Sequence, residues 1–274
     1  MLFPRLLTAL IGLPLLVAGI YFGSWPFFFL ILGVSFLALR EYYYLAEECG
    51  YPTYRWIGMV LGLGVVVSVS LNGTALGQVT ENQVTAALLS LGVIVLALRS
   101  ILRGPTDTLL SEWGTTFYGV MFVAWPLAHL LLIRDLRPQG LAATFFLFVL
   151  IWSEDSVAYI AGTRWGRHPI AGHVSPKKTW EGTLAGLAAA VGVAAGFQAT
   201  LLKQDLHFTE ALLLGLTVGV LAFASDLSES LLKRVAGMKD SSPLLPGHGG
   251  ILDRFDSFLL TAPVFYYYWA FVKH

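Results

Sequence analysis

A charged, glycine-rich stretch of the sequence lies at the edge of its most apolar material. Residues 244–257, LLPGHGGILDRFDS, include one histidine, three glycines, two aspartates and one arginine. Asp253 and Asp256 are three residues apart, so they would share one face of a helix, close to the positive end of its dipole. Carboxylates on one face suit a hard cation that prefers oxygen ligands. The same spacing also suits simple capping of a helix N-terminus, and both interpretations stay open.

A third carboxylate stands in apolar surroundings upstream of this stretch. Asp226 follows fifteen uncharged residues after Glu210. A carboxylate at membrane depth is costly unless it is paired or binds a cation. Asp226 and Asp253 could converge on one cation if the loop between them folds back. The alternative is that Asp226 marks a helix end that emerges into water.

A glycine-rich segment with basic neighbours joins these acids. The segment PGHGG, residues 246–250, allows a ligand to approach the backbone closely because glycine has no Cβ. Carboxylates beside a basic, glycine-rich loop are typical of phosphate handling. His248 is a candidate acid, base or phosphate donor, or simply a loop residue. Basic residues at a membrane edge are also ordinary determinants of topology. The basic residues here are Lys233, Arg234, Lys239 and Arg254.

A second polar stretch contains a candidate anion site. SPKKTWEG places Ser175, Lys177, Lys178 and Thr179 just before an apolar segment. Lysines and hydroxyls at a helix N-terminus fit an anion such as a triphosphate. The spacing is not that of a Walker A loop, and contact with a lipid headgroup is an equal alternative. Asp155, in the apolar segment before this stretch, is a further candidate functional acid.

The elements that would hold these residues are membrane helices. The chain has 274 residues, of which 56% are hydrophobic and 12% charged, against about 25% charged in typical soluble domains. Apolar runs near the length that crosses about 30 Å of hydrocarbon recur throughout. We therefore predict an all-α polytopic integral membrane protein with about nine transmembrane helices. The predicted spans are 5–22, 24–40, 57–72, 83–99, 114–133, 141–162, 183–202, 209–232 and 255–272.

The distribution of lysine and arginine predicts the orientation. With a cytoplasmic N-terminus, the inside segments hold 13 of these residues and the outside segments hold 4. The two large polar loops, residues 162–182 and 233–254, then face the cytoplasm. We expect a membrane scaffold of about five spans in residues 1–140 and a catalytic membrane domain of about four spans in residues 141–274.

The charge balance and the cysteine count limit other interpretations. The chain has 17 basic and 17 acidic residues, so nothing indicates a nucleic-acid partner and we expect none. Cys49 is the one cysteine of the sequence, which excludes an intramolecular disulfide.

At the charged stretch the sequence resembles the phosphatidate cytidylyltransferases, or CDP-diacylglycerol synthases. The signature of that family runs Ser, any, apolar, Lys-Arg, four any, Lys-Asp, and on to His-Gly-Gly, apolar, any, Asp-Arg, apolar, Asp. Residues 230–256, SLLKRVAGMKDSSPLLPGHGGILDRFD, fill every fixed position. DSVAYIAGTRWG and VSPKKTWEG upstream also resemble the family. Small departures are Ser225, where glycine often precedes the aspartate, and the pair Ser242 and Pro243.

The resemblance implies a reaction, its cofactor and a location. CTP and phosphatidate would give CDP-diacylglycerol and pyrophosphate, with dependence on a divalent cation, usually Mg²⁺. A second, monovalent cation such as K⁺ and a homodimer are compatible with the same resemblance. We expect an integral protein of a bacterial inner (cytoplasmic) membrane, with its active site facing the cytoplasm and both CTP and phosphatidate as partners.

The resemblance also assigns roles to residues. It makes Asp226 and Asp253 the leading metal ligands, with Asp256 and Asp155 as further candidates. The expected catalytic residues are Asp226, Asp253, Asp256, Lys239 and His248. For the substrates, we expect Lys177, Lys178 and Lys239 on the triphosphate with Ser175 and Thr179 as hydrogen-bond donors, and Lys233, Arg234 and Arg254 on phosphate or on the carboxylates.

Two rival functions remain at this stage. A CDP-alcohol phosphatidyltransferase would show a DG-x2-AR…G-x3-D-x3-D pattern, which is absent from the sequence. An ion-coupled transporter would use Asp155 and Asp226 as coupling sites, but transporters often show paired repeats in both halves. The crowding of charge in the C-terminal half argues against transport.

Overall fold

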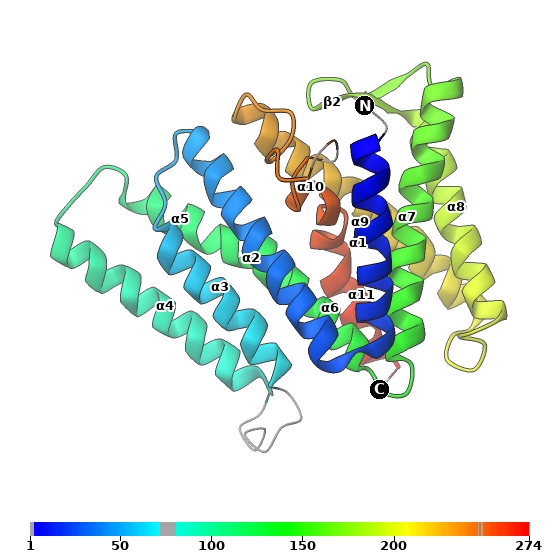
Figure 1. Ribbon diagram of the computed structural model, residues 1–274, viewed down its shortest axis with the longest axis horizontal. Helices are drawn as coiled ribbons and strands as arrows, with labels where there is room; N and C mark the ends of the chain where they lie inside the picture. Colours follow the sequence, from blue (N-terminus) through cyan, green and yellow to red (C-terminus); the bar gives the residue numbers. More distant parts are fainter. Residues whose placement is uncertain (1–2, 72–80, 246, 248, 274) are drawn as a thin grey trace. The chain divides into compact units, whose positions relative to one another are not determined.

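The protein is built from long helices connected by short segments (Figure 1). This computed structural model describes residues 3–71, 81–245, 247 and 249–273. The elements are α1 (Phe3–Phe22), α2 (Ser24–Glu48), α3 (Arg55–Ser70), α4 (Glu81–Arg103), α5 (Leu109–Gly119), the π-helical η1 (Val120–Ala124), α6 (Trp125–Asp135), α7 (Gly140–Trp165), β1 (Pro169–Ala171), β2 (Ser175–Thr179), α8 (Trp180–Ala199), α9 (Phe208–Val235), α10 (Leu252–Phe255) and α11 (Phe258–Val272).

The prediction of an all-α polytopic membrane protein is confirmed. Within the described residues, six helical runs are long and apolar enough to cross a bilayer, and two shorter apolar helices are Leu10–Phe22 and Arg55–Ser70. The predicted count of nine spans is therefore not confirmed. The six runs are Ser24–Glu48, Gln83–Arg103, Leu109–Asp135, Gly140–Trp165, Trp180–Ala199 and Phe208–Val235.

A small hairpin interrupts the helical pattern between α7 and α8. Strands β1 and β2 pair antiparallel, with Pro169 opposite Thr179 and Ala171 opposite Ser175. Sequence reasoning treated this stretch only as a loop. The hairpin holds the backbone of Lys177 and Lys178, the two lysines predicted to bind phosphate, in an extended conformation directly before α8.

The chain divides into two compact units. The first contains Met1–Leu132 and Val235–Phe255, and the second contains Ile133–Arg234 and Asp256–His274. The segment Val235–Phe255, which carries much of the signature, thus packs with the N-terminal helices. The division by sequence into 1–140 and 141–274 concerned function and stays a prediction.

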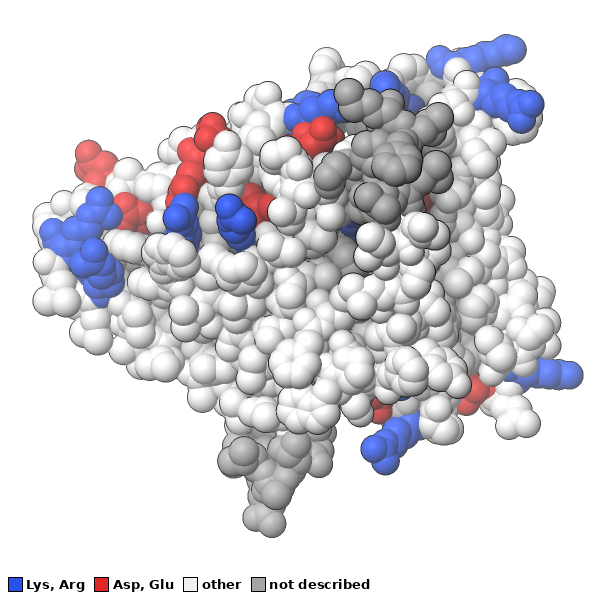
Figure 2. All heavy atoms as spheres, viewed as in Figure 1, with Lys and Arg blue, Asp and Glu red and all other residues white. Residues whose placement is uncertain are grey.

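The core of the first unit is apolar and contains a few hydroxyl groups that form hydrogen bonds. Val65, Leu39 and Phe27 are almost completely buried, and Tyr43 lies among such residues with its hydroxyl donating to the Thr116 carbonyl oxygen at 2.8 Å. On the face shown in Figure 2, the charged side chains over α2 to α4 lie toward one end of these helices and the sides are uncharged. This distribution suits helices that lie in lipid.

The second unit depends on close contact between α7 and α8. A Cβ added at Gly182 would lie 2.7 Å from the Ala158 carbonyl oxygen and 3.0 Å from the Gly162 Cα. Both neighbours are backbone atoms, so they cannot move aside without shifting a helix. Small residues at such positions let membrane helices approach closely.

This contact leads to a prediction about stability. Gly182→Ala should lower the free energy of unfolding by about 1–3 kcal/mol, since overpacking forces the backbones apart. Gly192→Ala on the same helix is the matched control, because no atom lies within 4 Å of its added Cβ. Thermal melting in detergent compares the two variants. Equal melting temperatures would show that the close contact does not limit stability.

Candidate active site

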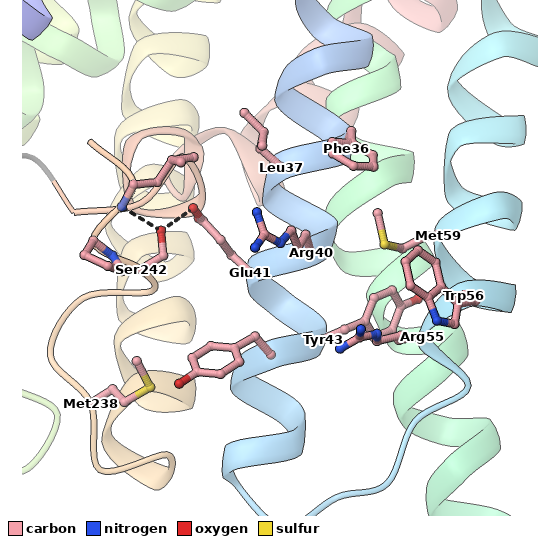
Figure 3. A pocket seen from close by; sticks show the side chains of 13 residues that line it. Phe36, Leu37, Arg40, Glu41, Tyr43, Arg55, Trp56, Met59, Met238 and Ser242 are labelled. Carbon is pink, nitrogen blue, oxygen red and sulfur yellow. Dashed lines mark hydrogen bonds between the residues drawn. The ribbon is translucent and has the colours of Figure 1, made fainter. Parts of the chain in front are cut away.

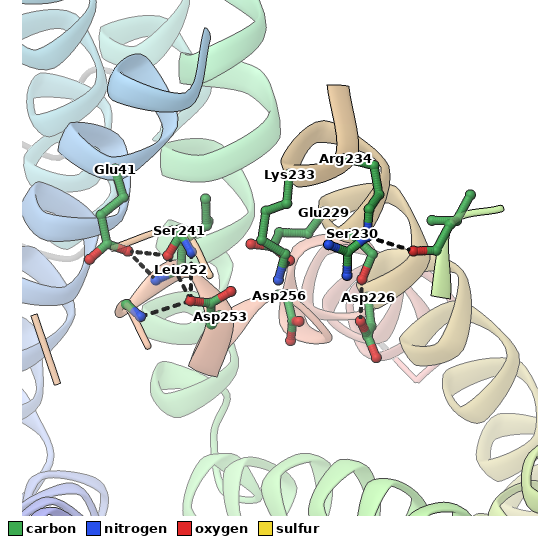
Figure 4. A network of polar contacts seen from close by, with 12 residues as sticks. Glu41, Asp226, Glu229, Ser230, Lys233, Arg234, Ser241, Leu252, Asp253 and Asp256 are labelled. Atoms are coloured by element: carbon green, nitrogen blue, oxygen red, sulfur yellow. Dashed lines mark hydrogen bonds and ion pairs between the residues drawn. The ribbon is translucent and has the colours of Figure 1, made fainter. Parts of the chain in front are cut away.

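A buried glutamate of the first unit accepts hydrogen bonds from residues 238–253, the signature segment. Glu41, on α2, is 5% exposed. Its Oε2 accepts hydrogen bonds from Ser241 Oγ at 2.9 Å and Leu252 N at 2.7 Å. Its Oε1 accepts from Ser242 Oγ at 2.6 Å and Ile251 N at 3.1 Å. Figure 4 shows the carboxylate pointing from α2 toward Ser241 and Leu252.

Asp253, a predicted metal ligand, joins the same network. Its Oδ2 accepts hydrogen bonds from Ser241 N at 2.9 Å and from Gly250 N at 2.7 Å. It also lies 2.9 Å from Ser241 Oγ, whose single proton it shares with Glu41 Oε2. A Cβ at Gly250 would lie 2.1 Å from Ser241 Oγ and 2.3 Å from Glu41 Oε2. The glycine at this position therefore makes room for the polar groups of the protein itself.

The signature segment borders a cavity of the first unit. The cavity has a volume of about 580 Å³ and lies between α2, α3 and residues 238–244 (Figure 3). Its lining is mostly apolar and aromatic, with Arg40 and Arg55 as its basic residues. Arg55 Nη1 lies 3.6 Å from Glu47 Oε2, and its guanidinium lies over the Trp56 ring at 5.1 Å. The cavity therefore combines apolar walls with two guanidinium groups and the carboxylate of Glu41.

In the second unit, Asp226 lies beside one of the predicted phosphate-binding lysines. Lys178 Nζ is 2.5 Å from Asp226 Oδ2 and lies over the Phe223 ring at 4.8 Å from its centroid. Ser230 Oγ donates to Asp226 Oδ1 at 3.3 Å (Figure 4). The half-buried carboxylate on α9 is thus paired with an amine from the end of β2.

Asp256 lies where it interacts with further charges of the second unit. The negative charges of Asp226 and Asp155 repel its carboxylate, and the positive charge of Lys233 attracts it. Its Oδ1 accepts a hydrogen bond from Ser257 N at 2.6 Å. The structure therefore brings three predicted metal-binding acids of this unit into electrostatic contact.

Ser225 explains one departure from the signature pattern. Its hydroxyl donates to the backbone oxygen of Asp256 and accepts from Leu260 N at 3.1 Å. A glycine could not make these bonds. Ser225 therefore fixes the start of α11 against α9 and so helps to place Asp256.

Other predicted phosphate ligands contact the protein itself. Lys233 forms an ion pair with Glu229 one turn earlier on α9, and both are buried. Arg234 Nε donates to the Val174 carbonyl oxygen at 3.0 Å, which fastens the β hairpin to the end of α9. Thr179 accepts a hydrogen bond from Gly182 N at 3.2 Å and caps α8.

The remaining predicted residues lie at the surface or outside the described residues. Lys177, Lys239 and Arg254 are exposed, and Ser175 is half-buried in β2. His248 lies outside the described residues. The exposed cations are those that solvent and a dissolved nucleotide reach most directly.

Comparison with known proteins identifies the family of the chain. A model of the cytidylyltransferase family matches residues 3–272, which is nearly the whole chain. The chain belongs to the cytidylyltransferase family. The match extends well beyond the signature and includes the N-terminal helices.

Several curated relatives are similar over almost their full length. A phosphatidate cytidylyltransferase of Synechocystis sp. is 31% identical over 96% of this chain and 95% of its own length. A protein of the same name from Pseudomonas aeruginosa is 33% identical, covering 97% of this chain and 96% of the relative. One from Bacillus subtilis is 30% identical, covering 96% of each.

The acids of this cytidylyltransferase suit a hard divalent cation. Within the described part of the chain, no three His, Cys, Asp or Glu side chains form a ready-made metal cage. Mg²⁺, however, is usually bound by one or two carboxylates together with substrate phosphates and water. Asp226 and Asp256, which repel each other, offer such carboxylates. The donor set therefore fits Mg²⁺.

Sequence reasoning missed one residue of this cytidylyltransferase site. Glu41 directly follows the predicted span 24–40, and it was not singled out from the sequence. The helix continues to Glu48, which leaves Glu41 inside a buried face. The available signal was an isolated carboxylate one residue after a long apolar run.

Proposed function

We propose that this cytidylyltransferase transfers the cytidylyl group of CTP to phosphatidate and releases pyrophosphate. One observation carries the proposal: relatives named phosphatidate cytidylyltransferase match 96% or more of the chain. The acids and lysines of the second unit support it, because both substrates are polyanions. The product is CDP-diacylglycerol.

The chemistry places few demands on a base. A phosphate oxygen of phosphatidate forms a bond with the α-phosphorus of CTP, and the bond from that phosphorus to the bridging oxygen of the β-phosphate breaks. The attacking group is already an anion, so the main obstacle is repulsion between two anions. A bound Mg²⁺ supplies charge neutralisation of the phosphates and of the leaving pyrophosphate.

The residues of the chain have separate tasks in this proposal. Asp226 and Asp253 would hold the metal, with Asp256 and Asp155 as further ligands. Lys177 and Lys239, which are exposed, would bind the triphosphate of CTP.

Lys178 has a second effect beside its charge. By pairing with Asp226 it orients that carboxylate before substrates arrive. Ser230 donates to the other oxygen of the same group and restricts its rotation. Oriented carboxylates of this kind reduce the reorganisation that binding requires.

The location follows from the two substrates. CTP is dissolved in the cytoplasm and phosphatidate lies in the bilayer, so we place the site at the cytoplasmic helix ends of a bacterial inner membrane. The excess of basic residues in the loops that would face inward supports this orientation. A K⁺ beside the Mg²⁺ and a homodimer are part of the proposal on the ground of family resemblance alone.

One assay tests the function and its dependence on metal. Purified protein with CTP labelled at the α-phosphate, phosphatidate and Mg²⁺ should transfer label into an organic extract. EDTA should lower the rate by about 100-fold or more, because a metal stabilises the transition state by several kcal/mol, and excess Mg²⁺ should restore it. Diacylglycerol, which lacks the phosphate, is the control acceptor. Label that stays in the aqueous phase would contradict the function, and full activity in EDTA would contradict the role of the metal.

A further inference from the structure

We infer that Glu41 is a positioning residue that holds the signature segment in its working conformation. The inference concerns the segment from Ser241 to Asp253. Hydroxyl and backbone N–H groups of this segment donate hydrogen bonds to the carboxylates of Glu41 and Asp253. Its kinetic consequence rests on the proposed function. Its structural consequence does not, so the two are tested separately.

The four hydrogen bonds of Glu41 use its whole accepting capacity. A carboxylate offers about four lone-pair sites. Here each oxygen accepts two hydrogen bonds, one from a serine hydroxyl and one from a backbone amide. A carboxylate engaged in this way has no lone pair left for a cation. Glu41 therefore acts through the segment and not on the substrates.

Because the Glu41 carboxylate is buried, it requires the hydrogen bonds from the signature segment. Removing a charged carboxylate from water costs several kcal/mol unless hydrogen bonds compensate. Among the described residues no basic side chain forms an ion pair with Glu41, so the donors of the signature segment provide this compensation. The carboxylate and the segment thus stabilise each other, and displacing the segment would leave a buried charge without donors.

Ser241 connects this anchor to a predicted metal ligand. Its hydroxyl lies 2.9 Å from both Glu41 Oε2 and Asp253 Oδ2. Leu252, the residue before Asp253, donates its backbone N–H to Glu41 at 2.7 Å. The position of the Asp253 carboxylate is therefore set by Glu41 through one bridging side chain and one adjacent amide.

The same anchor shapes one wall of the cavity in the first unit. Ser242, Pro243 and Leu244 line the cavity, and Ser242 Oγ donates to Glu41 Oε1. Figure 3 shows Glu41 and Ser242 pointing toward each other at the edge of the cavity. Release of the segment would therefore change the shape of this wall as well.

The test compares Glu41→Gln with Glu41→Asp and with a matched control on the same helix. In Glu41→Gln the amide nitrogen is a donor that faces other donors. We expect kcat to fall by about 10- to 100-fold, because a displacement of about 1 Å can cost two orders of magnitude. The KM for CTP should change by less than about threefold, and Glu41→Asp should recover part of kcat. Glu48→Gln, at an exposed acid of α2, should leave kcat unchanged.

Hydrogen exchange gives a readout that a general loss of stability would not imitate. The amides of Ile251 and Leu252 should exchange about tenfold faster in Glu41→Gln than in the wild type, while the amides of α7 keep their protection. Ser242→Ala removes one donor without leaving a new buried donor, so it should show a smaller change in the same direction. Its effect should not add to that of Glu41→Gln, because both variants break the same bond.

The outcomes separate this inference from the proposed function. If Glu41→Gln keeps the wild-type kcat and the wild-type exchange at Leu252, the inference is wrong. A loss of kcat with unchanged exchange would also overturn it, because Glu41 would then act directly on a substrate. A wild-type protein without cytidylyl transfer would refute the proposed function, while the exchange measurement would still decide whether Glu41 holds the segment.

Discussion

Asp226→Asn is expected to lower kcat by about 1,000-fold with little change in the melting temperature. Asparagine has the same shape and can still accept the hydrogen bond that Ser230 donates to Oδ1. It carries no charge, so it neither binds a divalent cation well nor attracts Lys178, whose Nζ lies 2.5 Å away. Loss of a metal ligand and of preorganised charge removes several kcal/mol from the stabilisation of the transition state.

The control for this variant lies at the other end of the same helix. Glu210 on α9 forms an ion pair with Lys273, so Glu210→Gln breaks a contact of the same kind away from the predicted site. Its kcat should stay within about twofold of the wild type, because this half-buried ion pair lies away from the predicted site. Steady-state kinetics with varied Mg²⁺ measures both variants. Wild-type turnover in Asp226→Asn would remove Asp226 from the metal site.

The helical architecture could be predicted because hydropathy depends on local composition. Long apolar runs separated by charged segments leave few alternatives to membrane helices. The β hairpin could not be predicted in the same way, since Pro169–Ala171 and Ser175–Thr179 have no strand-like alternation of apolar and polar residues. Its conformation depends on contacts made elsewhere, such as the bond from Arg234 to Val174.

The candidate site could be predicted only where residues are close in sequence. The signature gave Asp253 and its glycine neighbours, but it gave no reason for those glycines beyond the approach of a ligand. The structure supplies a reason within the protein: Gly250 leaves room for Glu41, which lies 209 positions away in the chain. Contacts over such a separation follow from packing and have no local pattern.

The roles of Lys178 and Lys233 also could not be predicted from residues close in sequence. Sequence reasoning assigned Lys178 to the triphosphate and Lys233 to phosphate or to the carboxylates. The structure places each beside an acid, Asp226 and Glu229 respectively. A positive charge in the sequence thus reports either a ligand contact or the neutralisation of a buried carboxylate, and only the surrounding structure distinguishes the two roles.

Asp253→Asn and Asp253→Ala together separate the charge of this residue from its hydrogen bonds. The Asp253 carboxylate accepts bonds from Ser241 and from the Gly250 amide. The side-chain oxygen of asparagine can accept the same bonds, whereas alanine cannot. We expect both variants to lose kcat by about 100- to 1,000-fold, because both remove a predicted metal ligand. Only Asp253→Ala should speed hydrogen exchange at Gly250.

The comparison between these two variants decides what the aspartate contributes. If Asp253→Asn retained wild-type kcat while Asp253→Ala lost it, the residue would serve the loop conformation and would not bind the metal. Asp107→Asn, at an exposed acid of the first unit, controls for the loss of one negative charge and should leave kcat unchanged. Because a neutral side chain can satisfy the amides of the signature segment, an aspartate is required at this position only if its charge acts on the substrates or on their cation.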